Sequence, residues 1–332
     1  MHIVVDAMGG DHAPHNIVEG VVRAIKEFEK VHITLVGLEE QVRTELKKFD
    51  CPQDRIDIVH ADEVIDMHEP ATVSIRKKRN SSISVGIKLL KEKHFDAFVS
   101  AGNTGAVVAA STIRLGMLKG VERSAIGLVI PTLNKFSFLM DVGANTDPKP
   151  QHLLQSALMS RVYAREVLDV ADPAVALLNI GSEESKGTGF EKEMYKKMEE
   201  CIPNFIGNIE ANAIFTGQAD CIICDGYVGN IVIKISEGLM ESAAALMRRE
   251  IKKSPIALFG AILMKSRLNH IKRYADYTEY GGAPLLGVNG IVMICHGRSN
   301  PKAIKNAIRA TMREIEHNII QCMETDLKKT TK

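Results

Sequence analysis

Short glycine-rich segments that also carry polar side chains recur along the sequence, and they contain the residues best placed to do chemistry. Two of them read Asp6-Ala7-Met8-Gly9-Gly10-Asp11 and Ser100-Ala101-Gly102-Asn103-Thr104-Gly105. Glycine lets a ligand approach the backbone closely, and a helix that begins after such a loop offers free amide groups and the positive end of its dipole. The segments therefore indicate a cradle for an anion. Four further segments of the same character cover residues 141–145, 179–187, 225–230 and 279–287.

A single loop of this kind is explained better by a tight turn of its own, but six of them favour a shared anion site. Lys186 is the one lysine set directly in a glycine loop, where its ammonium group could meet a phosphate or a developing oxyanion. The adjacent Glu183 and Glu184 could instead hold it in a surface ion pair. Asp225 and His12 could orient a substrate or transfer a proton. The alternatives are that Asp225 caps a helix or turn and that His12 is structural or solvated.

Several well-known site signatures are missing from the sequence. There is no Gly-x4-Gly-Lys-Ser/Thr phosphate loop, no Gly-x-Gly-x2-Gly dinucleotide fingerprint and no Gly-x-Ser-x-Gly nucleophile elbow. Cys221 and Cys224 lie three residues apart in an apolar run, so on a strand they point to opposite faces, and no second pair completes a zinc site. We therefore expect no metal and no cofactor, and the sequence does not indicate covalent catalysis.

The composition is that of an ordinary globular protein. Of the 332 residues, 45% are hydrophobic and 25% are charged, and 42 Lys and Arg against 41 Asp and Glu give a formal charge of +1. This balance provides no overall field to attract nucleic acid, so any anion site must be local. No apolar run approaches the roughly 18 residues of a membrane-spanning helix, and no basic region precedes the first predicted strand. The expected location is cytoplasmic.

The loops need a scaffold that brings them together, and the hydrophobic pattern predicts one. β-branched apolar runs of strand length alternate with longer amphipathic stretches along the whole chain. This alternation predicts an α/β fold, a three-layer α/β/α arrangement with a mostly parallel sheet, and residues 1–332 as a single catalytic unit. Ligands of such sheets bind beyond the carboxyl ends of the strands, where the loops meet. The predicted strands are 2–5, 32–36, 56–59, 97–100, 125–130, 138–142, 175–179, 221–224 and 291–294, and the predicted helices are 14–29, 39–48, 85–93, 105–116, 149–168, 188–200, 228–252 and 301–323.

Two other segments stand out by charge or polarity. The run Arg76-Lys77-Lys78-Arg79 is the strongest basic cluster, and it is either a solvated face or a docking patch for an acidic protein or a phosphate group. Between Pro255 and Tyr274, apolar residues recur near helical spacing with lysine and arginine among them. We take 253–283 as an amphipathic helical segment for dimer or membrane contact, with an acyl-chain contact or ordinary core packing as alternatives.

Five of the loops, in their order along the chain, resemble those of the PlsX family, the bacterial phosphate acyltransferases of phospholipid synthesis. The resemblance is carried by residues 6–11, 100–106, 141–145, 225–230 and 279–287 and spans nearly the whole chain. It implies a fold similar to isopropylmalate dehydrogenase and to phosphotransacetylase, a homodimer, and peripheral contact with the cytoplasmic membrane. Thr188 departs from the asparagine expected after Lys-Gly, and the stretch at Ala71-Thr72 is less proline-rich than usual.

The activity that the resemblance implies is the transfer of a long-chain fatty acyl group from acyl carrier protein to inorganic phosphate, which gives acyl phosphate for glycerophospholipid synthesis. Acyl carrier protein is acidic and needs a basic docking patch, either at Arg76–Arg79 or at 265–273. A downstream glycerol-phosphate acyltransferase could be a further partner, and nucleic acid is not an expected one. The rival hypotheses are a transferase that uses acyl-coenzyme A and a non-catalytic membrane scaffold.

Phosphate is already a nucleophile, so direct attack on the thioester needs positioning and oxyanion stabilisation rather than a covalent enzyme intermediate. On this hypothesis Lys186, Asn230, Asp225 and His12 are assigned to catalysis. The residues assigned to substrate binding are Asp6, Gly9, Gly10, Asp11, Gly102, Asn103, Thr104, Asn145, Gly181, Gly229, Gly281 and Gly282.

Overall fold

The computed structural model describes residues 1–92, 94–268 and 281–330. The strands are β1 (His2–Asp6), β2 (His32–Gly37), β3 (Ile56–His60), β4 (Ala97–Ser100), β5 (Ala125–Pro131), β6 (Phe136–Met140), β7 (Val175–Asn179), β8 (Phe205–Glu210), β9 (Cys221–Ile223), β10 (Ala283–Leu286) and β11 (Ile291–Ile294). The helices are α1 (His15–Glu27), α2 (Glu39–Leu46), α3 (Ala71–Lys77), α4 (Ser82–Lys91), α5 (Thr104–Arg114), α6 (Pro150–Glu166), α7 (Gly189–Cys201), α8 (Gly226–Lys252), α9 (Pro255–Leu263), α11 (Pro301–Glu316) and α12 (Ile319–Thr330). Every strand predicted from the sequence is present, with its ends within two residues of the prediction.

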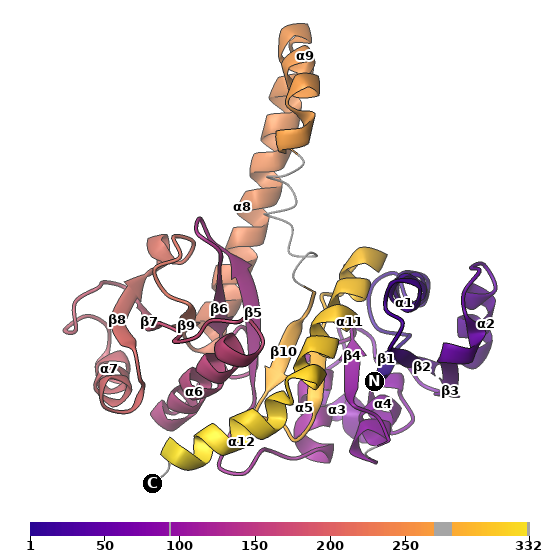
Figure 1. Cartoon of the computed structure of the whole chain (residues 1–332), viewed down its shortest axis with the longest axis horizontal. Coiled ribbons are helices and arrows are strands. Elements are labelled where there is room, and N and C mark those ends of the chain that lie inside the picture. Colours follow the sequence, from indigo (N-terminus) through magenta and orange to yellow (C-terminus); the bar gives the residue numbers. More distant parts are fainter. Residues whose placement is uncertain (93, 269–280, 331–332) are drawn as a thin grey trace.

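The strands form one sheet in the order β3-β2-β1-β4-β11-β10-β5-β6-β9-β7-β8 (Figure 1). Most neighbouring pairs are parallel, which confirms the expected mostly parallel sheet. β10 is antiparallel to both β11 and β5, and β6 turns back antiparallel to β5. As a result, β6, β9, β7 and β8 run in the direction opposite to β1, β2, β3, β4 and β11.

Helices cover both faces of the sheet, because the apolar side chains of its strands alternate between two sides. In β1, Ile3 and Val5 join a core cluster that includes side chains of α1, α6, α7, α11 and α12. Val4 points the other way, into a cluster with side chains of α3, α4 and α5. The other half of the sheet meets α8 on this second face through Val232 and Ile233. The three-layer α/β/α architecture is therefore confirmed.

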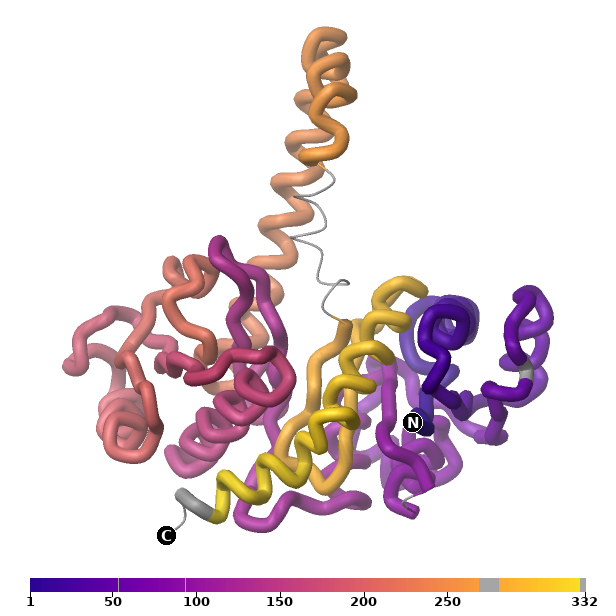
Figure 2. Tube along the Cα trace, in the orientation of Figure 1, coloured from indigo at the N-terminus to yellow at the C-terminus, as the bar shows by residue number. Residues whose placement is uncertain are grey.

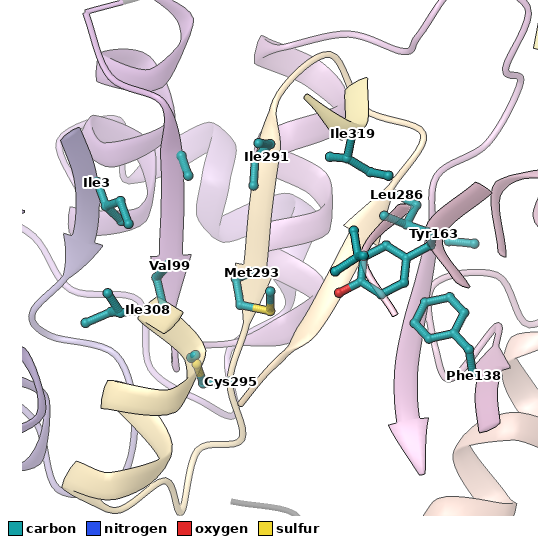
Figure 3. Close-up of a cluster of buried hydrophobic side chains, with 14 of the residues drawn as sticks. Ile3, Val99, Phe138, Tyr163, Leu286, Ile291, Met293, Cys295, Ile308 and Ile319 are labelled. Carbon is teal, nitrogen blue, oxygen red and sulfur yellow. The ribbon is translucent and has the colours of Figure 1, made fainter. Parts of the chain in front are cut away.

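β10 lies between two halves of the sheet, β3-β2-β1-β4-β11 on one side and β5-β6-β9-β7-β8 on the other. One core cluster runs across the junction between these halves (Figure 3). It contains Met293 of β11, Phe138 of β6 and Tyr163 of α6. The rings of Phe138 and Tyr163 stack with their centroids 4.5 Å apart. The hydroxyl group of Tyr163 donates to Oε1 of Glu314 at 3.2 Å. Glu314 is 1% exposed, and burial raises the pKa of its carboxyl group to about 8.

Three short elements and one helix end differ from the sequence-based expectation. α3 ends within the basic run, at Lys77, and β10 lies in a segment taken as a glycine loop. β8 is an edge strand interrupted by Gly207 at a φ of 92°. The last helix, expected to span 301–323, ends at Glu316 and a new one begins at Ile319. The break has a local cause, since Asn318 adopts a left-handed backbone with φ of 48°.

α8 and α9 form an arm that projects away from the rest of the molecule (Figure 2). α9 has the sequence PIALFGAIL, with no charged residue, and none of its side chains is buried. Lys265 and Arg267 follow it and are exposed. Of the segment expected at 253–283, residues 269–280 lie outside the described residues. In the described ranges, no helix is both long and apolar enough to cross a membrane.

Candidate functional site

The loops after β1 and β4 meet around one buried carboxyl group. Asp6 is 1% exposed, and burial raises its pKa. Its Oδ2 accepts from the hydroxyl group of Ser100 at 2.7 Å, and its Oδ1 accepts from the amide of Met8 at 3.0 Å. The hydroxyl oxygen of Ser100 in turn accepts from the amide of Gly102 at 3.0 Å. A Cβ atom at Gly9 would overlap the backbone nitrogen of Gly102, so this close approach requires glycine.

A third loop, residues 295–300 after β11, completes this group and was not predicted. The amide of Asp11 donates to the carbonyl oxygen of Gly297 at 2.9 Å. Gly10 has a φ of 101°, and a Cβ atom there would lie 2.9 Å from the same oxygen. The sequence carries a usable signal here, because Gly297 follows a predicted strand closely, as the glycines of the other loops do. We refer to residues 6–12, 100–105 and 295–300 as the first loop group.

α5 begins inside the first loop group with an open N-terminus. The side-chain oxygen of Asn103 accepts from the amide of Ala106 at 3.0 Å and so caps the helix. Its Nδ2 donates to three carbonyl oxygens of residues 66–69 at 3.0 to 3.2 Å. The Asn103 side chain is thus engaged in holding two segments together. Thr104 and Gly105 are exposed, and their amides have no acceptor within the part of the chain that the structure describes, so they are free donors at the helix end.

The segment held by Asn103 leads directly into the basic run. Oε1 of Glu69 accepts a hydrogen bond from the ammonium group of Lys78, and this bond is the main cause that lowers the pKa of Glu69 to about 2. The ammonium group of Lys78 is therefore already paired with a carboxylate within the chain. Arg76, Lys77 and Arg79 are exposed. Three exposed cations thus stand next to the segment that Asn103 anchors to the first loop group.

The loops after β6, β9 and β7 form a second loop group, residues 141–145, 225–230 and 179–187. Asp141 is 2% exposed, and burial raises its pKa. It accepts from the amides of Ile126 and of residues 143–145 at 2.7 to 3.2 Å. Nδ2 of Asn145 donates to Asp141 at 3.0 Å and to the carbonyl oxygen of Ser124 at 2.6 Å. The side-chain amide of Asn145 is therefore used in holding its own loop.

α8 begins in the second loop group, and its N-terminus is closed. Oδ1 of Asp225 accepts from the amides of residues 227 and 228, both at 2.9 Å. The amide of Gly226 donates to the carbonyl oxygen of Asn145 at 2.7 Å, and that of Gly229 donates to the carbonyl oxygen of Asp225 at 3.0 Å. The first amides of this helix are therefore satisfied. The capping carboxylate also occupies the positive end of the helix dipole, so its negative charge would repel a second anion there.

Lys186 and Asn230 occupy exposed positions in the second loop group. Nζ of Lys186 lies 4.0 Å from Oε1 of Glu183, with the two side chains 47% and 63% exposed. This is the geometry of a solvated surface ion pair. The backbone oxygen of Lys186 accepts from Nδ2 of Asn179 at 3.3 Å, which shapes the loop in front of α7.

The structure brings the predicted site residues together in two groups, so the expectation of one shared crevice is wrong for the single chain. The cause is strand direction: β6, β9 and β7 run against β1, β4 and β11, which puts their carboxyl ends at the opposite edge of the sheet. The first loop group contains Asp6, Gly9, Gly10, Asp11, His12, Gly102, Asn103 and Thr104. The second contains Asn145, Gly181, Lys186, Asp225, Gly229 and Asn230. Gly281 and Gly282 lie just before β10 at the first edge, where a Cβ atom at either would collide with α11 or β11.

The buried thiols are poorly suited to nucleophilic attack. Cys295 opens the third loop of the first group, and burial raises its pKa to about 12. Burial also raises the pKa of Cys221 and of Cys224. These thiols stay protonated near neutral pH, and the thiolate is the reactive form.

Comparison with known proteins gives consistent matches along the chain. The family described as fatty acid synthesis protein matches residues 1–322. The phosphate acyltransferase of Alkaliphilus oremlandii is 45% identical over 321 residues, which are 97% of this chain and 96% of that protein. The phosphate acyltransferase of Desulfitobacterium hafniense is 46% identical over 332 residues, which are 100% of this chain and 99% of that protein. A solved phosphotransacetylase from Streptococcus pyogenes has the same fold, with a TM-score of 0.61 and 19% identity over 95% of this chain and 94% of that one.

Proposed function

Because the chain belongs to the fatty acid synthesis protein family, and its relatives in that family are phosphate acyltransferases, we propose that it transfers an acyl group to inorganic phosphate. The donor is a long-chain fatty acyl thioester of acyl carrier protein. A phosphate oxygen attacks the thioester carbonyl carbon, the C–O bond forms, and the C–S bond breaks through a tetrahedral oxyanion. The products are acyl phosphate and the free thiol of the carrier, and the acyl phosphate then serves a glycerol-phosphate acyltransferase.

The observation that carries this proposal is the open N-terminus of α5 in the first loop group. The exposed amides of Thr104 and Gly105 stand at the positive end of the helix dipole, where an anion is stabilised. Gly9 approaches Gly102 so closely that Gly9 has no room for a side chain, and the Asp6 carboxylate lies beside both glycines. Asp6 is a positioning residue that ties these loops together through Ser100. Phosphate, and then the oxyanion that forms from the thioester carbonyl, bind at these amides.

Direct attack by phosphate agrees with the state of the thiols. The raised pKa of Cys295 leaves no thiolate next to the first loop group at neutral pH. Positioning and electrostatic stabilisation are then the sources of rate enhancement. His12 and Asp11 lie on the exposed rim of the group, where they are candidates for proton transfer.

The reaction class is tested by incubating the purified protein with palmitoyl-acyl carrier protein and phosphate. Acyl phosphate is trapped as a hydroxamate while the free thiol of the carrier is followed. We expect both products to depend on phosphate, and palmitoyl-coenzyme A to be the poorer donor. Thiol release without hydroxamate would mean hydrolysis, and a preference for acyl-coenzyme A would favour the rival transferase.

The phosphate site is tested by removing one amide donor without breaking the helix. Thr104 is the first residue of α5, a position at which proline is tolerated, so Thr104→Pro deletes a single N–H group. We expect a higher KM for phosphate. Thr104→Val, which keeps the amide, and Gly189→Pro, at the equivalent position of α7, are the matched controls.

The second loop group is the alternative place for phosphate, with Lys186 and Asn230 as its ligands. Lys186→Ala and Asn230→Ala are expected to leave the KM for phosphate unchanged. An increase in these two variants, together with no effect of Thr104→Pro, would move the site to the second loop group.

We further propose that acyl carrier protein docks on the exposed cations of the basic run. Arg76, Lys77 and Arg79 are exposed, and Asn103 connects the preceding segment to the proposed phosphate site. Arg76→Glu with Arg79→Glu should raise the KM for the acyl carrier protein substrate, because the partner is acidic. The same reversal at Lys265 and Arg267 tests the other candidate patch. No change in either double variant would remove both patches as docking sites.

The arm is proposed to contact the membrane through α9, in keeping with a peripheral location at the cytoplasmic membrane. Ile256, Phe259, Ile262 and Leu263 are all more than 60% exposed. Leu258→Glu and Leu263→Glu should abolish binding to liposomes without unfolding the protein. Leu133→Glu is the control, since Leu133 is 83% exposed but lies between β5 and β6. A change of oligomeric state in the α9 variants, with liposome binding retained, would assign α9 to the proposed homodimer contact instead.

A further inference from the structure

Two histidines and an aspartate gather on three neighbouring strands at the edge of the sheet where β1 begins. His2 of β1 pairs in register with His32 of β2, and Thr34, two residues further along β2, pairs with Asp57 of β3. Side chains two apart on a strand share a face, so His2, His32 and Asp57 lie on the same face of the sheet. His2 and Asp6 are four residues apart along β1, about 13 Å. This cluster is therefore separate from the first loop group.

The three side chains are already oriented toward one another. The rings of His2 and His32 meet edge to face, with their centroids 4.5 Å apart. Nε2 of His32 lies 2.7 Å from Oδ2 of Asp57, and Nε2 of His2 lies 2.9 Å from Oγ1 of Thr34. The ring of Phe95 packs against that of His2, with the two ring centroids 4.4 Å apart. One donor atom from each of His2, His32 and Asp57 lies within 4.8 Å of the other two.

We propose that His2, His32 and Asp57 form a binding site for a divalent transition-metal cation of the Zn²⁺ type. Two imidazole nitrogens and one carboxylate oxygen suit Zn²⁺, Co²⁺ or Ni²⁺ and are a poor set for Mg²⁺ or Ca²⁺, which prefer oxygen ligands. The ligands of a tetrahedral zinc ion lie about 3.4 Å from one another, so the site closes with side-chain shifts of about 1 Å. The ion takes the place of the hydrogen between His32 and Asp57, with His32 in the tautomer that is protonated on Nδ1. Water completes the coordination.

The chain contains a matched pair that shows what distinguishes this cluster. Nε2 of His60 lies 2.8 Å from Oδ1 of Asp62, and both side chains are at least half exposed. This histidine–aspartate contact resembles that of His32 and Asp57 in distance. Among the described residues, no further histidine, cysteine or carboxylate side chain joins His60 and Asp62 to make a group of three. A simple ion pair accounts for His60 and Asp62, whereas the convergence of His2 on His32 and Asp57 adds the further nitrogen that a metal ion needs.

The ligands come from strands that are far apart in the sequence, which is why no spacing motif revealed them. An ion at this place would link β1, β2 and β3 through its bonds to one side chain on each strand. Because the ion binds the folded chain, it should also stabilise the fold. The sequence predicted no metal because it lacks a spacing motif for ligands, and a site assembled from three strands has no such motif.

The experiment uses tag-free protein with Co²⁺ as the spectroscopic probe and Zn²⁺ as the competitor. Equilibrium dialysis should give one Co²⁺ per chain, with the visible absorption of a tetrahedral complex, and Zn²⁺ should displace it and raise the Tm. His2→Gln, His32→Asn and Asp57→Asn should each weaken Co²⁺ binding by about tenfold or more. His60→Gln should bind Co²⁺ as the wild-type chain does.

Asp57→Asn keeps the test decisive if a histidine variant misfolds, since the Asp57 side chain is 62% exposed. The proposal is overturned if Asp57→Asn and His2→Gln bind Co²⁺ as tightly as the wild-type chain. It is also overturned if the bound Co²⁺ has only the weak absorption of an octahedral aquo complex, or if His60→Gln removes the binding.

Discussion

Glu314 should make the fold less stable as the pH rises, and glutamine at this position should remove that dependence. Burial of the side chain raises its pKa from 4.5 to about 8. In the unfolded chain the carboxyl group ionises near its ordinary value, whereas the folded chain holds the proton over this whole interval. The folded state therefore binds the extra proton, so this contribution to stability is complete below the unfolded pKa and is lost as the pH rises through the folded one.

The size of the effect follows from the shift. Each pH unit within the interval changes the free energy of unfolding by about 1.4 kcal/mol. The wild-type chain should lose about 3 kcal/mol between the unfolded pKa and about pH 7, and about 5 kcal/mol in all by about pH 8. Glu314→Gln keeps an oxygen that accepts from the hydroxyl group of Tyr163, and it never ionises. Its stability should therefore not follow this slope.

Urea unfolding at a series of pH values measures the difference. The chain contains no tryptophan, so circular dichroism is the suitable probe. The variant and the wild-type chain should differ by a constant at low pH and diverge steadily up to about pH 8. Glu316→Gln, at an exposed position two residues along α11, should stay parallel to the wild type. Parallel curves for Glu314→Gln as well would refute the reasoning.

Three further variants test other parts of the structure. A Cβ atom at Gly229 would overlap the carbonyl oxygen of Asp141, so Gly229→Ala should destabilise the fold by about 1–3 kcal/mol. Gly238→Ala, on an open part of the same helix, should stabilise it by about 0.5–1 kcal/mol, and equal urea midpoints for these two variants would contradict this. Asn103→Ala removes a helix cap and three hydrogen bonds to residues 66–69. It should lower the free energy of unfolding by about 2–4 kcal/mol and raise the KM for acyl carrier protein. If neither quantity changes, this side chain holds nothing in place. Cys295→Ala should retain turnover, and loss of turnover would indicate a covalent step. The wild-type thiol should resist iodoacetamide in the folded state, because burial raises its pKa to about 12.

The strands could be predicted well because their signal is local. Runs such as Ile3–Val5 and 97–100 are apolar on both faces, which is typical of strands covered on two sides. β10 escaped prediction because Gly281 and Gly282 precede it and Pro284 lies within it, so the segment has the composition of a turn. Its strand conformation depends on pairing with β5 and β11, which a local pattern does not reveal.

The loops of the candidate site were found from the sequence, but their grouping was not. The grouping depends on strand direction, and one clue was present: the connection from β5 to β6 is too short for a parallel crossover. β6 must therefore turn back, and the loop at Asp141 must lie at the other edge. The use of Asn103 and Asn145 as structural side chains could not be foreseen, because their partners at residues 66–69 and at Ser124 are distant in the sequence.

The short strand β10 has a consequence for how the molecule responds to temperature. It pairs with each neighbour through only two residues, so few backbone hydrogen bonds connect the two halves of the sheet. Side chains of one core cluster also cross the junction, with Met293 of β11 on one side and Phe138 of β6 on the other (Figure 3). Apolar contacts weaken on cooling. Near freezing, the junction should therefore loosen before either half unfolds, and cold inactivation of this protein would begin as a separation of two intact halves.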